Sequence, residues 1–357
     1  NNRRKSMLNL TKTQKICIQY GFLLLLICMT VYLVSTTLDI TLIPMIMKLV
    51  NKKFIFIGFL IMVLYIILEC TIINILIKTI QKTKVRFLAV KIAMMGFYYN
   101  LVTPFASGTQ PMQIYALNKY DINLSKSIAI VTNKTVLFQT VVTIYSAVII
   151  FLNIEVLKNE LPSMLVLMSI GMVMNIVSLL GGMLIVLTPN TMKIIVKVIV
   201  NILYRLNIFK SLNKKIHTIN KFIDEYSYSI KLFIKNKKAL CLSIILTIIQ
   251  LTVFFSISYC VYKAFNLNGL SLFEVLSLQV FLYMSVSPIP TPGNVGANEV
   301  AFLTIFANVF PGNIIGYSVF LYSIYVYYFL VVVCGLFTIH THYHMNKRKN
   351  KNRNYTL

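Results

Sequence analysis

Long apolar runs separated by short polar or basic segments form the main pattern of this chain. Six of the runs approach the ~20 residues that an α-helix needs to cross a hydrocarbon core of about 30 Å. They lie at about 16–37, 54–77, 127–152, 163–187, 239–263 and 313–340. Because the runs carry few charged residues, the pattern predicts six membrane-spanning helices.

Two further apolar regions are interrupted by helix-breaking residues. The region at about 91–118 contains Pro104, Gly108 and Pro111, and the region at about 271–309 contains the stretch SPIPTPGNVG. Irregular backbone persists at membrane depth only where protein or water satisfies its polar groups. The sequence therefore predicts two re-entrant or tightly turned hairpins beside the six spans.

The distribution of lysine and arginine predicts which loops face the cytoplasm. The basic segments are the N-terminus, the linker 78–91, the segment 190–238 and the tail 341–357. The loop 153–162 carries Glu155 and Glu160 and is the best candidate for an external loop. Counting the spans then makes the loop 38–53 external too, although its three lysines oppose this assignment.

The order of the segments predicts an internal repeat. Residues 1–152 read span, span, broken hairpin, span, and residues 163–340 read the same way. Each half crosses the membrane an odd number of times, so the second half is inverted, which is a recurring plan in transporters. We expect an all-α polytopic membrane protein with repeats 1–152 and 153–340, a basic amphipathic segment at 190–238, and a basic cytoplasmic tail at 341–357.

Composition supports a membrane protein and argues against a soluble one. The chain is 58% hydrophobic and 12% charged, whereas soluble domains carry about a quarter charged residues. The net charge of +25 suits cytoplasmic loops beside anionic headgroups. We therefore expect anionic phospholipids as partners and no nucleic acid. Assembly into a homo-oligomer stays open.

Cysteine and histidine give no clear metal signal. The cysteines are Cys17, Cys28, Cys70, Cys241, Cys260 and Cys334, which lie in or beside apolar runs without paired spacing and read as small core residues. His340, His342 and His344 alternate, so only the first and last share a helical face. A helix end at the membrane interface is favoured over a metal site, and we expect no metal or cofactor.

Ionisable residues inside apolar runs are costly and usually functional. Lys134 lies about seven residues into its span, roughly 10 Å deep, and Glu69 about eight residues from the same side, roughly 12 Å deep. The matching depths predict that the two residues form an ion pair, either for packing or for binding. Glu299, on the returning arm of the second broken region, could hold a half-helix, orient a cation or carry a proton.

The two breaks suggest an anion site. Ser107 or Thr109 could cap one half-helix with Pro111 in its first turn, and Asn294 could cap another. Half-helix N-termini offer unpaired N–H groups and a positive dipole end. The candidate ligand-binding residues are Asn100, Ser107, Gly108, Thr109, Gln110, Gln113, Lys134, Gly293, Asn294 and Glu299. No catalytic constellation or nucleotide-binding fingerprint is present.

At these motifs the chain resembles the membrane region of lysylphosphatidylglycerol synthases, the multiple peptide resistance factor group, and its stand-alone flippase-like relatives. The resemblance rests on FYYNLVTPFASGTQPMQIYALNKYDINLSKSIAIVTNK at 97–134, PIPTPGNVGANEVAF at 288–302, and the pair Tyr327-Tyr328. The chain departs from the family at Thr109, where a second glycine is frequent. It departs also at Gln113, near which members of the family often have a basic residue. A third departure is Ser323, since the family often has an arginine shortly before the paired tyrosines.

The resemblance implies a protein of the bacterial cell membrane, and the basic N-terminus and tail predict that both termini lie in the cytoplasm. It implies a flippase-like transporter of an anionic or aminoacylated phospholipid, or of a lipid-linked sugar phosphate. An alternative is a phosphatidylglycerol lysyltransferase or its membrane subunit, but only a short basic tail follows residue 340, so we expect the part that handles lipid. A membrane scaffold is the third reading.

Overall fold

The computed structural model describes residues 41–83, 85–188, 198 and 213–354, and this part of the chain is helical without any strand. Within these residues, five helical stretches are long and apolar enough to span a membrane: Lys52–Ile80, Leu124–Leu152, Pro162–Leu184, Lys237–Ala264 and Ile315–Met345. They match five of the six predicted spans, and the sixth, 16–37, lies outside the described residues. The prediction of an all-α polytopic membrane protein is confirmed.

The helices follow one another along the chain with short connections. Outside the two broken regions they are α2 (Leu42–Leu49), α3 (Lys52–Ile80), α6 (Leu124–Leu152), α7 (Ile154–Glu160), α8 (Pro162–Leu187), α10 (Asn213–Lys235), α11 (Lys237–Phe255), α12 (Ile257–Ala264), α15 (Ile315–Ser323), the π-helical turn η4 (Ile324–Phe329) and α16 (Leu330–Asn354). The residues predicted as a tail from 341 instead continue α16 as far as Asn354, because lysine and arginine are good helix formers.

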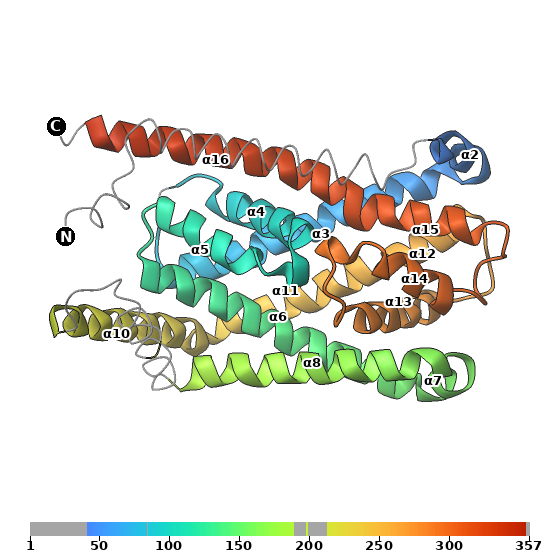
Figure 1. The fold of residues 1–357 in the computed structure, drawn as a ribbon, viewed down its shortest axis with the longest axis horizontal. Helices are drawn as coiled ribbons and strands as arrows, with labels where there is room; N and C mark the ends of the chain where they lie inside the picture. The colour runs from blue at the N-terminus through green and yellow to red at the C-terminus, as the bar shows by residue number, and fades with distance from the viewer. Residues whose placement is uncertain (1–40, 84, 189–197, 199–212, 355–357) are drawn as a thin grey trace, which may run out of the picture.

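Both broken regions form hairpins of two short helices joined by a 3₁₀ turn. The first consists of α4 (Leu88–Val102), η2 (Pro104–Ala106) and α5 (Thr109–Lys119), and the second of α13 (Leu272–Val286), η3 (Pro292–Asn294) and α14 (Ala297–Ile305). The hairpins enter the bundle from opposite ends, and their turns η2 and η3 contact each other inside it (Figure 1). The predicted hairpins are therefore confirmed, whereas the inverted repeat stays a prediction.

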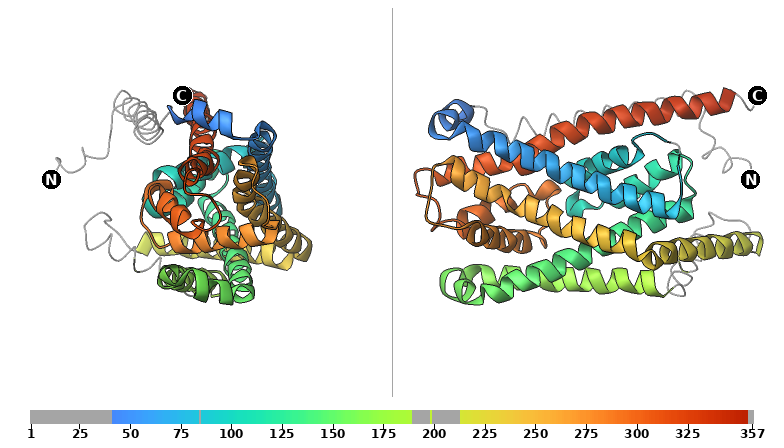
Figure 2. Two further views of the ribbon diagram at one scale, coloured as in Figure 1. Left: turned by 90° about the vertical axis from the view of Figure 1, so that its right-hand side faces the viewer. Right: turned by 180° about the vertical axis from the view of Figure 1, so that it is seen from behind.

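The connections gather at the two ends of the bundle in the way that the predicted topology requires. The connections 153–161 and 265–271 lie at one end with α2, and the connections 81–87 and 120–123 lie at the other end with α10 (Figures 1 and 2). The lysines that opposed an external loop at 38–53 thus share an end with Glu155. Which end faces the cytoplasm stays a prediction.

Helix α10 packs against α6 and α3 at the end of the bundle (Figure 2). Its buried side chains recur at helical spacing as Ile223, Tyr226, Ile230 and Phe233. The predicted amphipathic segment 190–238 is described only in this part, because residues 189–197 and 199–212 lie outside the described chain. The described portion is an amphipathic helix whose apolar face is covered by protein.

Helix α8 lies at the periphery of the bundle and packs on α6, α7 and α13. Only 11% of its apolar window is buried inside the protein, so most of its surface is available to lipid. At Gly171 the backbone of α8 comes so close to α13 that a Cβ would overlap the Met284 carbonyl oxygen. This close approach fixes the position of the second hairpin against α8.

Candidate functional site

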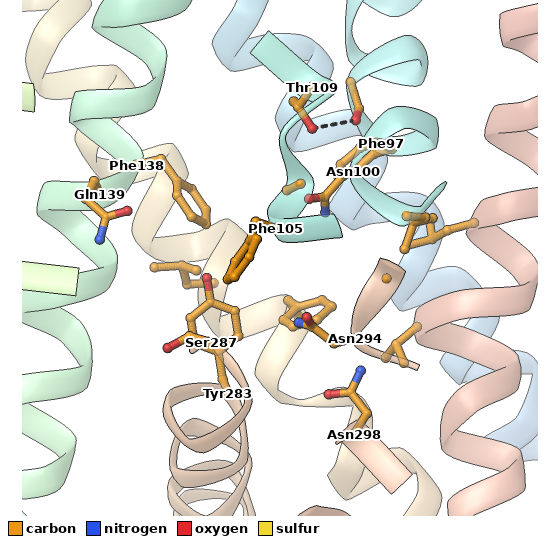
Figure 3. Close-up of a pocket in the computed structure, with 18 of the residues that line it drawn as sticks. Phe97, Asn100, Phe105, Thr109, Phe138, Gln139, Tyr283, Ser287, Asn294 and Asn298 are labelled. Atoms are coloured by element: carbon orange, nitrogen blue, oxygen red, sulfur yellow. Dashed lines mark hydrogen bonds between the residues drawn. The ribbon is translucent and has the colours of Figure 1, made fainter. Parts of the chain in front are cut away.

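A cavity of about 480 Å³ lies where the two hairpin turns meet (Figure 3). Its polar lining includes the side-chain amides of Asn100, Gln110, Gln113, Gln139, Asn175, Gln279, Asn294 and Asn298. Its apolar lining is mainly aromatic: Tyr65, Phe97, Phe105, Phe138, Phe254, Tyr283 and Tyr322. A space in the middle of an apolar bundle thus combines many hydrogen-bonding groups with flat hydrophobic walls.

Glu69 on α3 and Lys134 on α6 form an ion pair in the cavity wall. The Lys134 Nζ lies 2.7 Å from Glu69 Oε1, and the second carboxylate oxygen accepts a hydrogen bond of 3.0 Å from Gln250 Nε2. The side chains are 6% and 18% exposed for Glu69 and Lys134 respectively. The two residues are the only charged ones among the described residues that line the cavity. The structure thus brings together the pair that their depths predicted.

The first break is stabilised by Thr103, and the predicted cap is wrong. The Gly108 N–H donates to Thr103 Oγ1 at 3.0 Å, and that hydroxyl donates to the Tyr99 carbonyl at 2.6 Å. Helix α5 begins at Thr109 without a side-chain cap, and the Thr109 hydroxyl points back to the Gly96 carbonyl at 3.4 Å. Thr109 cannot cap the helix because it is already its first residue, and Ser107 is exposed.

The second break is also capped differently from the prediction. Asn294 lies in η3 with a φ of 57°, and α14 begins only at Ala297, so Asn294 is too early to cap it. The Glu299 carboxylate instead accepts the Gly296 N–H at 2.6 Å and the Ser323 hydroxyl at 2.8 Å. Glu299 therefore holds the start of α14 and joins it to α15, outside the cavity lining.

Seven of the predicted binding residues line the cavity: Asn100, Thr109, Gln110, Gln113, Lys134, Gly293 and Asn294. Ser107, Gly108 and Glu299 do not line it. The Gln113 side chain is buried and donates to the Ile92 carbonyl at 3.3 Å, so it also fixes α5 to α4.

Several lining residues were not anticipated. Gln139 Nε2 donates to Asn175 Oδ1 at 2.7 Å, and Asn175 Nδ2 lies 3.3 Å from Ser287 Oγ, which links α6, α8 and the end of α13. Gln279 Nε2 donates to the Tyr322 hydroxyl at 2.6 Å. The available signal was a polar side chain inside an apolar run, which the sequence shows at Gln139 and Asn175.

The C-terminal histidines and the cysteines among the described residues do not line the cavity. His342 Nε2 lies 3.1 Å from the Tyr99 hydroxyl, and the rings of His340 and His344 pair at 4.4 Å. Cys70, Cys241, Cys260 and Cys334 are free thiols. Across the described chain, no group of three or more histidine, cysteine, aspartate or glutamate side chains is arranged to hold a metal ion.

The fold and the cavity define a helical membrane protein with a polar site between two opposed hairpins. Residues 18–334 match the family described as the lysylphosphatidylglycerol synthase TM region, and the chain belongs to this family. No curated protein and no solved structure gives a significant match to the chain.

Proposed function

We propose that this protein moves a phospholipid, or another lipid with a phosphate-bearing headgroup, between the two leaflets of a bacterial cell membrane. The observation that carries this proposal is the cavity at the contact between hairpins that enter from opposite ends. A site at such a contact is separated from each end of the bundle by one hairpin only. Membership of a lipid-related membrane family supports the proposal.

The chemistry of the cavity suits a lipid headgroup. Thr109 and Gln110 belong to the first turn of α5, where N–H groups lack partners within the helix and the dipole end is positive. Asn100 and Lys134 line the same cavity and supply side-chain donors for a bound phosphate. Phe105 and Phe138 give apolar walls on which a glycerol backbone can lie.

The proposed transport cycle uses the two halves of the chain as an inverted repeat. The hairpins α4–α5 and α13–α14 alternately open the cavity toward opposite ends, and the N- and C-termini lie in the cytoplasm. Glu299 moves α14 together with α15, because its carboxylate bonds both helices. The polar network of Gln139, Asn175 and Ser287 holds α13 to α8 and α6 in the present state.

The family description favours a second candidate, the membrane part of a phosphatidylglycerol lysyltransferase. In that case the cavity would bind the lipid for modification, with no need to move it across the bilayer. A membrane scaffold without transport predicts that the polar lining is replaceable. A flipping measurement separates the transporter from both of these alternatives.

The test uses proteoliposomes containing phospholipids with a fluorophore on one acyl chain, which leaves the headgroup unaltered. Dithionite quenches the outer leaflet, and the loss of the protected fraction reports flipping. We expect Asn100→Leu and Gln110→Leu to slow flipping at least about tenfold, because a hydrogen bond to a charged group contributes roughly 1.5–3 kcal/mol. Asn159→Leu, an exposed position on α7, is the matched control. Parental flipping by both cavity variants would refute the proposed site.

A further inference from the structure

The charges that line the cavity sum to zero, because its single lysine is paired with its single glutamate among the described residues. We infer that the site selects a zwitterionic headgroup of net charge zero, with one phosphate and one ammonium group. This inference rests on the proposed function and specifies its substrate. It differs from a site for anionic lipid, which Lys134 alone would indicate.

The Glu69 end of the ion pair has the features of an ammonium site. Tyr65 and Glu69 lie four residues apart on one face of α3 and both line the cavity. The Tyr65 ring packs against Phe97 and Phe254 with ring centroids 5.1 Å apart in both pairs. A carboxylate beside aromatic faces is the arrangement that attracts ammonium cations.

The Lys134 end of the ion pair can take a phosphate. The Lys134 ammonium has three donors, of which the contact with Glu69 uses one, and it lies 5.3 Å from the Phe138 ring centre. Its side chain is more exposed than that of Glu69. The first turn of α5 adds backbone N–H groups from Thr109 and Gln110. A phosphate can therefore join Lys134 while an ammonium joins Glu69.

A further buried group calls for a donor on the ligand. Gln279 is fully buried on α13 and lines the cavity. Its Nε2 donates to Tyr322, but its Oε1 has no hydrogen-bond partner within the described chain. Buried acceptors without partners are costly, so a ligand that brings an N–H or O–H donor to Gln279 is favoured over one that brings only acceptors.

Net charge decides between headgroups. A phosphodiester without an amine would add an uncompensated negative charge to a neutral site, and a lysyl ester with two ammonium groups would add an uncompensated positive charge. Either excess is disfavoured by desolvation. An ethanolamine phosphodiester brings both charges and leaves the sum at zero.

The experiment compares acyl-labelled phosphatidylethanolamine, phosphatidylglycerol and lysylphosphatidylglycerol in the same proteoliposomes. For the parent protein we expect phosphatidylethanolamine to flip at least about tenfold faster than the other two, since a factor of ten corresponds to a modest difference in binding free energy. Glu69→Gln leaves Lys134 unpaired and should reverse the preference toward phosphatidylglycerol. Lys134→Met should shift it toward lysylphosphatidylglycerol.

A second ion pair provides the matched control. Lys126 on α6 lies 3.7 Å from Glu225 on α10, outside the cavity lining. Lys126→Met and Glu225→Gln should leave the headgroup preference unchanged. If the parent flips phosphatidylglycerol as fast as phosphatidylethanolamine, transport stands and the inferred selectivity is refuted. If no lipid flips, the proposed function itself fails. The comparison on the parent protein decides the matter even if Glu69→Gln does not accumulate.

A soluble molecule can carry the same phosphate and ammonium groups as the lipid headgroup, so a last measurement separates a lipid ligand from a soluble one. Thermal unfolding in detergent is followed with short-chain phosphatidylethanolamine and with glycerophosphoethanolamine. We expect the lipid to raise the melting temperature at a concentration at least about tenfold lower than the soluble headgroup, because buried acyl chains add hydrophobic free energy. Equal potency of the two compounds would refute a lipid substrate and assign the site to a soluble zwitterion.

Discussion

Gly293 in η3 lies directly against the ring of Tyr327 in η4, so that a Cβ at residue 293 would overlap the ring and come within 2.9 Å of the Leu101 carbonyl oxygen. This contact brings the turn of the second hairpin against the π-helical turn and α4. It depends on glycine for two reasons, since the residue also has a φ of 60°.

We predict that Gly293→Ala lowers the melting temperature more than Gly296→Ala does. Gly296 has a φ of 81° and a ψ of −49°, and no heavy atom lies within 4 Å of the position that a Cβ would take, so its substitution costs only backbone strain, about 1–3 kcal/mol. Gly293→Ala adds steric overlap with Tyr327 and the Leu101 carbonyl to the cost of its own left-handed conformation. Thermal unfolding in detergent measures both variants, and equal losses would contradict the close contact with Tyr327.

The approach of α8 to α13 gives a second prediction. Gly171→Ala should destabilise the protein, because its Cβ would meet the Met284 carbonyl and lie 2.9 Å from Ser287 Oγ. Gly181→Ala on the same helix has no neighbour within 4 Å and should stabilise it by roughly 0.5–1 kcal/mol, the helix propensity difference. Opposite changes in melting temperature are expected. A stabilising Gly171→Ala would place α8 elsewhere.

The ion pair of Glu69 and Lys134 predicts strong coupling in a double-mutant cycle. Lys134→Met alone leaves a buried carboxylate without its cation and should cost up to about 3 kcal/mol, at the low end for buried pairs because Lys134 is partly exposed. Adding Glu69→Gln should recover part of that loss. Unfolding free energies of the parent, both single variants and the double variant give the coupling. Strictly additive effects would show that the pair does not interact.

Attachment of α10 should depend on pH through Glu225. Burial raises the pKa of this carboxyl group, but hydrogen bonds from Ser125 and Asn123 and the charge of Lys126 outweigh it, so its pKa lies below the ordinary 4.5. A lowered pKa means that the contact stabilises the fold fully above pH 4.5 and is lost as pH falls through the lowered value.

The measurement is hydrogen exchange of the α10 amides at pH 7 and at pH 4 or below, corrected for intrinsic rates. We expect protection of residues 213–235 to fall in acid in the parent. In Glu225→Gln the protection should already be lower at pH 7 and should change less with pH. Equal pH responses in the two proteins would mean that Glu225 does not hold α10.

The grouping of loops predicts their accessibility. In a background without native cysteines, single cysteines at Asn159 and Asn268 should react with an impermeant thiol reagent added to intact cells, because both positions are exposed at one end of the bundle. A cysteine at Lys82, exposed at the opposite end, should react only after permeabilisation. Labelling of residue 82 in intact cells would reverse the predicted orientation.

The parts of the fold that depend on local sequence were predictable. Apolar length alone identifies the described spans, and the constant rise of a helix places Glu69 and Lys134 at matching depth. The details of the breaks were not predictable, because Phe105, Ala106 and Asn294 all adopt positive φ without being glycine. Such conformations are imposed by the contacts between the two turns.

The lining of the cavity was predictable only in part for a related reason. Proline and glycine mark where the hairpins break, and the polar residues beside them line the cavity at Asn100, Gln110 and Asn294. Gln139 and Asn175 come from long helices, and their contact depends on how α6 and α8 are rotated against each other. A single sequence contains no direct signal for that rotation.

The balanced ion pair has an electrical consequence for transport. A unit charge that crosses the full membrane potential exchanges about 2.3 kcal/mol per 100 mV. Glu69 and Lys134 cancel, so a cavity that carries a neutral headgroup from one end to the other moves no net charge. Voltage would then neither drive nor oppose the proposed movement, and its direction would follow the difference in lipid concentration between the leaflets.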